Sequence, residues 1–280
     1  GTLTPAERRK RVVVVGGGPG GMEAARVAAL RGHEVVLFEK RPELGGQVNI
    51  HARAPMRAEF REVTDYLAMQ VSKLGVDVRL NKEASESDIL GLDADAVIVA
   101  TGSVPGRSLA SPFTSAPAAD SDVVLTIWEV LLEQREVGQR VLVVDEEGHH
   151  PAMNVAEFLA DKGKSVEVVT SLQHVANQLL LNLETPLIMM RLLSKGVTFT
   201  PYTVVSALNG GTVTLAGLAG GTARSVEVDT VVAVTGRLPV DNLYFALKGK
   251  VPELYRVGDC LAPRYTDQAI HEGHSVGRAV

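Results

Sequence analysis

The segment from residue 12 to residue 39 constrains the fold more than any other part of the chain. It reads VVVVGGGPGGMEAARVAALRGHEVVLFE, and the order is a β-branched run, a glycine-rich turn, an alanine-rich stretch and a second apolar run. A strand, glycine turn, helix and second strand in this order are typical of a dinucleotide-binding βαβ unit. We expect the strands at residues 12–15 and 35–38, and therefore a parallel sheet covered by helices.

Each glycine of the turn has its own expected role. Gly16 permits the tight turn out of the strand, Gly18 lets the backbone approach a pyrophosphate, and Gly21 lets the helix pack close to the sheet. The amino end of that helix favours phosphate through its unpaired amides and its dipole. Glu39 ends the second strand, where a carboxylate accepts hydrogen bonds from an adenosine ribose and disfavours a 2′-phosphate. The segment predicts a bound dinucleotide, and a turn without ligand is the alternative.

Size and charge narrow the class of protein. A chain of 280 residues with 45% hydrophobic content is expected to hold about two domains. The net charge of −5 offers no broad basic field, so we expect neither nucleic acid nor an anionic membrane as a partner. No apolar stretch reaches the roughly 20 residues that cross a bilayer, and the first residues lack the apolar core of a signal peptide. We expect a cytoplasmic protein.

The chain has one cysteine, Cys260. A disulfide-reductase mechanism needs a redox pair of thiols and an iron–sulfur cluster needs several thiolates, so neither is expected from this chain alone. Cys260 is expected to be a small buried side chain. His149 and His150 are adjacent, and His271 and His274 have no obvious companion ligands, so no metal site is expected.

The first unit continues through a helix that reaches about Lys73 and two further strands, the second of which stops at Thr101-Gly102. A Pro-, Ser- and Ala-rich stretch at 104–119 is typical of a connection between domains rather than of a packed element. We expect a cofactor-binding domain at 1–115 and 240–280 and a second domain at 116–239. The two further strands are expected at 76–80 and 95–100.

The second domain is expected to repeat the opening architecture, with a strand, a helix and a strand. Its turn, residues 145–151, reads DEEGHHP and has one glycine and three carboxylates. Carboxylates that face a pyrophosphate repel it, so NAD(P)H binding is disfavoured here. A different ligand contacted by His149 or His150 stays open. The three elements are expected at 140–144, 152–161 and 165–170.

The rest of the second domain predicts one apolar helical region and several short strands. Leu179, Leu183, Leu187 and Met190 have helix-like spacing, for which core packing is the first explanation. Apolar runs separated by glycine-rich turns then indicate a β-rich part. Those strands are expected at 197–200, 204–208, 212–215 and 226–235.

The end of the chain returns to nucleotide chemistry. A short strand at 254–258 is followed by Asp259 and by a helix at 267–279. Because ligands of a doubly wound sheet lie beyond the carboxyl ends of its strands, Asp259 is placed to hydrogen-bond ribityl hydroxyls. The alternative is an aspartate that caps a helix or stabilises a turn.

Five segments carry a family resemblance: GGGPGGMEAARVA, LGGQVNIHARAP, VIVATGSVP, VAVTGRLP and VGDCLAPRYTDQAIHEGHSVGRAV. Together they resemble the C-terminal portion of the trimethylamine dehydrogenase and 2,4-dienoyl-CoA reductase family of NADH:flavin oxidoreductases, over nearly the whole chain. The resemblance implies an α/β fold of two Rossmann-like domains with central parallel sheets, and FAD, or in some members only ADP. The candidate cofactor-binding residues are Gly16, Gly18, Pro19, Gly20, Gly21, Glu39, Lys40, Gly46, Gln47, Thr101, Gly102, Gly258 and Asp259.

Enzymes of that family also carry an N-terminal FMN-binding barrel and a cysteine-ligated iron–sulfur site, for which this chain offers neither room nor ligands. The turn at 145–151 is more similar to that of trimethylamine dehydrogenase than to the NAD(P)H-using reductases. The resemblance therefore implies an FAD-binding oxidoreductase component that relays electrons to or from a partner subunit or domain with FMN and an iron–sulfur cluster. We name no catalytic acid or base in this chain. An ADP-binding structural module and an NADH-dependent flavin reductase are the alternatives. The substrate, the direction of electron flow and the oligomeric state stay open.

Overall fold

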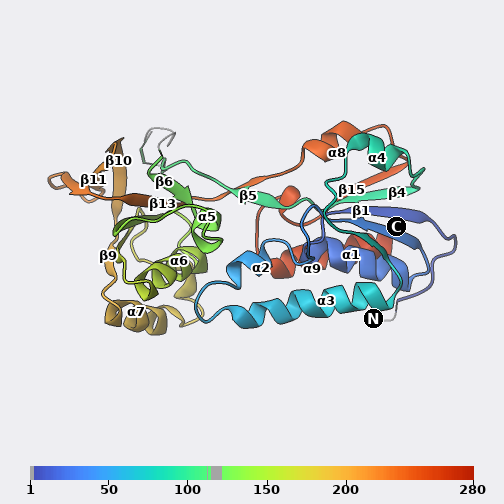
Figure 1. The fold of residues 1–280 in the computed structure, drawn as a ribbon, viewed down its shortest axis with the longest axis horizontal. Coiled ribbons are helices and arrows are strands. Elements are labelled where there is room, and N and C mark those ends of the chain that lie inside the picture. The colour runs from blue at the N-terminus through green and yellow to red at the C-terminus, as the bar shows by residue number, and fades with distance from the viewer. Residues whose placement is uncertain (1–2, 112, 115–121) are drawn as a thin grey trace. The chain divides into compact units, whose positions relative to one another are not determined.

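The computed structural model describes residues 3–111, 113–114 and 122–280 and divides into two compact units (Figure 1). Unit 1 comprises the residues up to 52 together with 58–104 and 238–280. Unit 2 comprises residues 53–57 and 105–237. The functional domains expected at 1–115 with 240–280 and at 116–239 remain a prediction.

A five-stranded parallel sheet forms the centre of unit 1, in the strand order β15-β4-β1-β2-β3. The predicted βαβ unit is confirmed, because Val12 pairs with Val35 of β2 on one side and with Ala96 of β4 on the other. Buried β-branched residues fit this position, between two strands and beneath helices on both faces. The strands are β1 (Arg11–Val15), β2 (Glu34–Phe38), β3 (Asp77–Arg79), β4 (Ala96–Val99) and β15 (Glu253–Arg256).

Helices cover both faces of this sheet (Figure 1). Val12 and Val14 face a core shared with α1, α3 and the end of α9, whereas Val13 and Val15 face one shared with α4 and α8. The helices are α1 (Pro19–Leu30), α2 (Val48–His51), α3 (Arg61–Lys73), α4 (Glu86–Leu90), α8 (Asn242–Leu247) and α9 (Thr266–Ala279), with short 3₁₀ turns η1 (Ala58–Phe60) and η3 (Gly258–Cys260).

Unit 2 repeats this architecture, as the sequence predicts. Its parallel sheet has the order β6-β13-β7-β8-β9, and α5 and α6 pack against its strands. The helix after β7 begins at His150, two residues earlier than expected, because Pro151 is well suited to a first turn. The elements are β6 (Val124–Thr126), α5 (Ile127–Leu131), β7 (Arg140–Asp145), α6 (His150–Asp161), β8 (Ser165–Thr170), η2 (Asn177–Leu179), α7 (Thr185–Ser194), β9 (Thr198–Thr200) and β13 (Thr230–Val234).

An antiparallel sheet packs on one face of the unit 2 sheet, where Val205, Val213 and Leu215 share a core with Leu142 and Val144. The prediction of a single strand at 226–235 is wrong. The segment forms the end of β12 and the whole of β13, and these two strands belong to different sheets. The antiparallel strands are β10 (Thr203–Asn209), β11 (Thr212–Gly217) and β12 (Arg224–Glu227).

The stretch at 104–119 is more structured at its beginning than expected. β5 (Ser103–Pro105) pairs with β14 (Arg237–Pro239) where the chain passes between the units, and Leu109 is buried in the core of unit 2. Residues 112 and 115–119 of this predicted connection lie outside the described residues.

The expectation that Leu179, Leu183, Leu187 and Met190 pack in the core is only partly correct. Leu179 is fully buried, but Leu183, Leu187 and Met190 are 78%, 67% and 69% exposed. The residues of α7 that are buried against the unit are instead Thr185, Ile188 and Leu192. Among the described residues, no helix combines the length and the apolar character that a membrane crossing requires.

Candidate functional site

The glycine turn after β1 combines two crowded positions with an open one. A Cβ at Gly16, where φ is +111°, would lie 2.2 Å from the carbonyl oxygen of Ala100, and one at Gly21 would lie 1.9 Å from the carbonyl oxygen of Gly16. No described atom lies within 4 Å of a Cβ built on Gly18. Glycine is therefore required at the first and third positions for packing, and the middle position leaves the backbone open to a ligand.

Helix α1 points its amino end at this turn. Its N-cap, Gly18, has no side chain to accept a hydrogen bond from the first amides, and its first turn contains no acidic residue. The helix begins with Pro19 and then Gly20 and Gly21. Uncapped first-turn amides and the positive end of the helix dipole favour an anion here.

Glu39 lies at the carboxyl end of β2 and is 6% exposed. Its Oε2 accepts a hydrogen bond of 2.7 Å from the Gly17 amide, and its Oε1 accepts one of 2.8 Å from the Arg41 amide. The carboxylate is thus fixed beside the glycine turn, as a ribose-binding residue requires. Lys40 lies at the surface, where its Nζ is 3.8 Å from Glu83, and nothing in its contacts ties it to the turn.

The segment Gly45–Gln47 packs on the same turn. The Gly45 amide donates to the carbonyl oxygen of Gly17 over 2.8 Å, and a Cβ at Gly46 would lie 3.0 Å from the Gly18 Cα. From there the Gln47 amide group reaches Asp259 Oδ2 at 2.7 Å. Residues that are more than 200 positions apart in the chain therefore meet at one edge of the sheet.

Asp259 is a buried carboxylate, and both of its oxygens accept hydrogen bonds from the chain. It is 7% exposed, and Oδ2 also accepts from the Ser103 hydroxyl at 2.8 Å, while Oδ1 accepts from the Arg264 amide at 3.0 Å. It does not cap a helix, because α9 begins at Thr266. The sequence analysis did not identify Ser103 as a residue of this site. Only its position directly after Thr101-Gly102 could have indicated it.

The remaining candidates also lie at this edge. Thr101 donates its hydroxyl to the carbonyl oxygen of Val240, and Gly102 has a φ of +74°. The Gly258 amide donates to Glu272 over 2.7 Å. Cys260 is fully buried as expected, and its thiol donates to backbone carbonyls; burial raises its pKa, so it is not a reactive thiolate.

The corresponding turn of unit 2 differs from the sequence expectation. Asp145 is fully buried, and its Oδ1 accepts hydrogen bonds from the amides of Glu147 and Gly148 at 3.0 and 2.9 Å. Glu146 accepts a hydrogen bond from the Ser171 hydroxyl. Burial raises the pKa of Asp145 to about 7 and also raises that of Glu146. The expectation that all three carboxylates face a phosphate is therefore wrong, because these two stabilise the loop instead.

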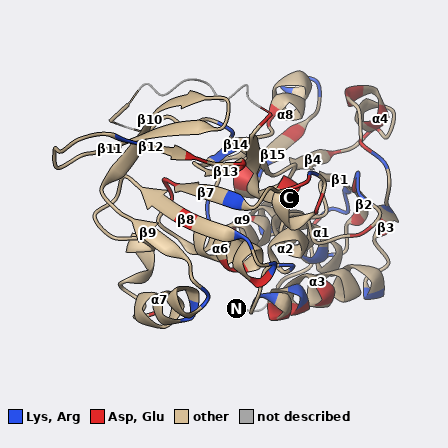
Figure 2. Cartoon of the chain, turned by 60° about the vertical axis from the view of Figure 1, so that its left-hand side comes forward, with Lys and Arg blue, Asp and Glu red and all other residues tan. Residues whose placement is uncertain are grey.

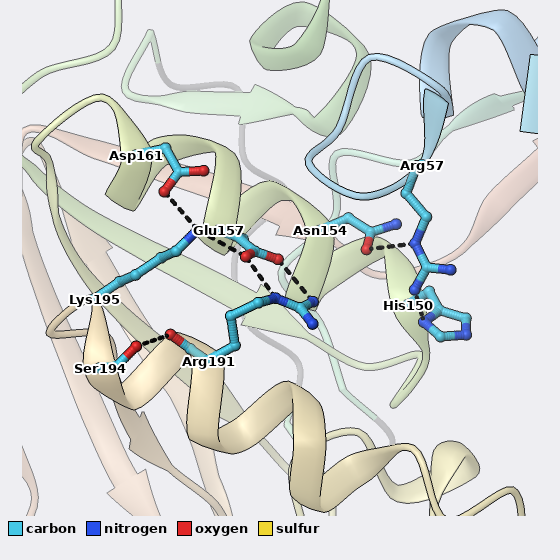
Figure 3. Close-up of polar contacts among 8 residues, drawn as sticks. All are labelled: Arg57, His150, Asn154, Glu157, Asp161, Arg191, Ser194 and Lys195. Carbon is cyan, nitrogen blue, oxygen red and sulfur yellow. Dashed lines mark hydrogen bonds and ion pairs between the residues drawn. The ribbon is translucent and has the colours of Figure 1, made fainter. Parts of the chain in front are cut away.

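His150, at the start of α6, is held by residues of the same unit (Figure 3). Its Nδ1 lies 2.6 Å from Arg57 Nη2. Its Nε2 lies 3.3 Å from Glu184. Burial, followed by the nearby Arg57 charge, lowers the His150 pKa to about 4. The ring is neutral at pH 7, so Nδ1 accepts from Arg57 and Nε2 carries the proton. Arg57 also donates a hydrogen bond of 3.2 Å to Asn154 Oδ1. His150 is therefore one member of a hydrogen-bond network that holds the start of α6.

Residues 10–273 match the family model of the pyridine nucleotide-disulphide oxidoreductases. The chain belongs to this family. Two curated relatives of the chain are the probable N-methylproline demethylase of Rhizobium meliloti and the N,N-dimethylglycine/sarcosine dehydrogenase of Chromohalobacter salexigens. Both are 34% identical, over 97% and 96% of this chain and over 43% and 44% of the relatives.

The solved structure of histamine dehydrogenase from Rhizobium sp. 4-9 matches all of this chain with a TM-score of 0.93 and 27% identity. The match covers 45% of that enzyme. This chain thus spans less than half the length of these relatives, and the resemblance to the C-terminal portion of trimethylamine dehydrogenase-like enzymes is confirmed. Groups of three or more His, Cys, Asp or Glu that could hold a metal are absent from the described parts of the chain.

Proposed function

We propose that this member of the pyridine nucleotide-disulphide oxidoreductase family is an FAD-binding component that relays electrons to or from a partner with FMN and an iron–sulfur cluster. The observation that carries the proposal is the convergence of the glycine turn, Glu39, Gly46–Gln47 and Asp259 at the carboxyl edge of the unit 1 sheet. Ligands of open α/β sheets bind at this edge. The dehydrogenase names of the relatives support redox chemistry.

The residues of unit 1 fit such a cofactor. The open backbone at Gly18 and the uncapped amides of α1 would hold the pyrophosphate, and Glu39 would accept hydrogen bonds from the ribose. Asp259, oriented by Gln47 and Ser103, would hydrogen-bond the ribityl chain. When bound, the flavin supplies the electron-transfer chemistry. The protein binds and orients it, and we assign no catalytic acid or base.

One observation favours a second candidate, an ADP-binding structural module. Both Asp259 oxygens already accept hydrogen bonds from the chain, and the Gly258 amide is engaged by Glu272. By contrast, no described atom lies within 4 Å of a Cβ built on Gly18, whose open backbone would contact the pyrophosphate of ADP. ADP would need the glycine turn and Glu39 but not Asp259.

An absorption spectrum of the purified protein, followed by chromatography of the ligand released on acid denaturation, tests the proposal. We expect oxidised flavin bands and release of FAD. A colourless protein that releases ADP would establish the second candidate. Bleaching of the flavin by NADH without a partner, in an anaerobic titration, would establish an NADH-dependent flavin reductase instead. Folded protein that retains neither FAD nor ADP after incubation with each would refute both nucleotide proposals.

A further inference from the structure

Residues 44–47, which we call the bridging segment, connect the two parts of the candidate site. The Gly45 amide donates a hydrogen bond to the carbonyl oxygen of Gly17 in the glycine turn. Two residues later, the Gln47 side-chain amide donates a hydrogen bond of 2.7 Å to Asp259. The bridging segment therefore contacts the turn that would bind the ADP part of FAD, and it orients the carboxylate that would bind the ribityl chain.

The backbone of the bridging segment needs support from other residues. Gly45 and Gly46 have φ values of +123° and +60°, and glycine loses more conformational freedom on folding than any other residue. Two consecutive glycines would leave the position of Gln47 poorly fixed if nothing else held the segment. Arg41 gives only weak support, because its Nη1 lies 3.4 Å from the carbonyl oxygen of Gly46.

Asn49 of α2 supplies stronger support. It is 8% exposed, and its side-chain amide donates a hydrogen bond of 2.8 Å to the carbonyl oxygen of Leu44. This hydrogen bond closes a loop around Gly45, Gly46 and Gln47. The same side chain packs on the segment, because a Cβ at Gly45 would lie 2.2 Å from Asn49 Oδ1. Asn49 thus fixes the backbone that presents Gln47.

Thr64 of α3 holds the Asn49 side chain. Helix α2 contacts α3, which carries charged residues along its length in Figure 2 and buries Thr64, Leu67 and Val71. The Thr64 hydroxyl lies 3.0 Å from Asn49 Oδ1 and 2.9 Å from the carbonyl oxygen of Arg61. Thr64 is 1% exposed, so removal of its hydroxyl leaves Asn49 Oδ1 without this partner in a place that water does not reach.

We propose that Asn49, held by Thr64, is a positioning residue that makes the site prefer FAD over ADP. This inference rests on the proposed function. Asn49 acts through Gln47, which places Asp259 for the ribityl chain. The glycine turn has separate support from Glu39, which accepts a hydrogen bond of 2.7 Å from it. ADP has no ribityl chain, so its binding depends on the turn and much less on Asn49.

Equilibrium dialysis of the ligand-free full chain against FAD and, in separate cells, against ADP tests the proposal. Asn49→Leu keeps the branched shape of the side chain and removes both hydrogen-bonding groups. We expect it to weaken FAD binding roughly 5- to 10-fold, as for one lost hydrogen bond, and ADP binding about twofold or less. Equal weakening of both ligands would indicate a general loosening of unit 1 and would overturn the proposal, as would an unchanged FAD affinity.

The matched control is Asn154→Leu in unit 2. Asn154 is also a buried asparagine, 5% exposed, whose side chain accepts a hydrogen bond from Arg57. All candidate cofactor-binding residues lie in unit 1, so this control should leave both affinities unchanged.

A second pair of variants keeps the proposal testable if Asn49→Leu does not fold. Thr64→Val removes the hydroxyl and keeps the β-branched shape, whereas Thr64→Ser keeps the hydroxyl. We expect Thr64→Val to lower the ratio of FAD affinity to ADP affinity roughly 2- to 5-fold and Thr64→Ser to keep the ratio of the unmodified chain. The same ratio in both variants would contradict the proposal.

The path through Gln47 is tested with Gln47→Ala, alone and combined with Asn49→Leu. The double variant should bind FAD about as weakly as Gln47→Ala alone, because residues that act through one another are not additive. Multiplied effects would contradict this path. Failure of the proposed function appears as an unmodified chain that does not retain FAD, which would overturn both proposals. Failure of this inference alone appears as an unmodified chain that retains FAD and variants with an unchanged affinity ratio.

Discussion

Replacement of Asp145 by asparagine should remove a large pH dependence from the stability of unit 2. Asp145 is fully buried in the turn after β7, and its Oδ2 has no hydrogen-bond partner among the described residues. Burial, with smaller contributions from the neighbouring Glu147 and Glu146 charges, outweighs the lowering effect of the Gly148 and Glu147 amides and raises its pKa from 3.8 to about 7. The carboxyl group therefore keeps a proton in the folded state at pH values where the unfolded chain has lost it.

The difference between the folded and unfolded pKa of Asp145 sets the sign and the size of the pH dependence of stability. A pKa raised by folding gives a contribution to stability that is complete below pH 3.8 and is lost as the pH rises through about 7. At about 1.4 kcal/mol per pKa unit, the free energy of unfolding should fall by as much as ~4 kcal/mol over this range. Asparagine keeps an Oδ1 acceptor for the Glu147 and Gly148 amides and has no charge to bury. The variant should therefore match the natural protein near pH 4 and exceed it by a few kcal/mol, about 2–4, at pH 8.

Urea denaturation at a series of pH values measures this effect. The one tryptophan of the chain, Trp128, lies in α5 of the same unit, so its fluorescence reports the relevant transition. Glu136→Gln, at an exposed acid of unit 2, is the control and should leave the pH profile unchanged. Parallel profiles of the free energy of unfolding against pH for the natural protein and Asp145→Asn would refute the reasoning. They would show that folding does not change the pKa of the Asp145 carboxyl group.

Three further changes have expected outcomes. Gly273→Ala should lower the free energy of unfolding of unit 1 by about 1–3 kcal/mol in urea denaturation, because its Cβ would lie 2.1 Å from the Gly20 carbonyl oxygen in the contact of α1 with α9; an unchanged midpoint would argue against that close contact. Glu157→Gln should destabilise unit 2 by about 2–3 kcal/mol, measured by Trp128 fluorescence, because Arg191 and Lys195 lose their buried partner. Glu39→Ala should weaken FAD retention roughly 10- to 100-fold in equilibrium dialysis, and an unchanged affinity would remove Glu39 from the site.

The sequence predicted the two parallel sheets and the glycine turn well, because both depend on local patterns. The β-branched runs at 12–15 and 140–144 became central strands. Gly16 and Gly21 occupy positions where a Cβ would collide with backbone, and that requirement follows from the strand-turn-helix geometry. These features depend on neighbouring residues and are therefore visible in one sequence.

Other features depend on contacts between distant segments and were not predictable. Helix-like spacing identifies Leu187 and Met190 as one side of a helix, but it does not say whether anything covers that side. The sequence of the turn predicts that Asp145 faces a ligand, whereas its carboxylate is buried at the end of β7, which lies between β8 and β13. The contribution of Ser103 to the Asp259 cluster likewise depends on residues 156 positions apart.

We propose that FAD binds at the carboxyl edge of the unit 1 sheet. Equilibrium dialysis of the ligand-free protein against FAD, with ADP in a parallel cell and the Glu39→Ala variant as comparison, tests it most directly. We predict stoichiometric retention of FAD with a perturbed flavin spectrum, and weaker retention by the variant. Correctly folded protein that does not retain FAD would contradict this proposal, and retention of ADP alone would support the structural module instead.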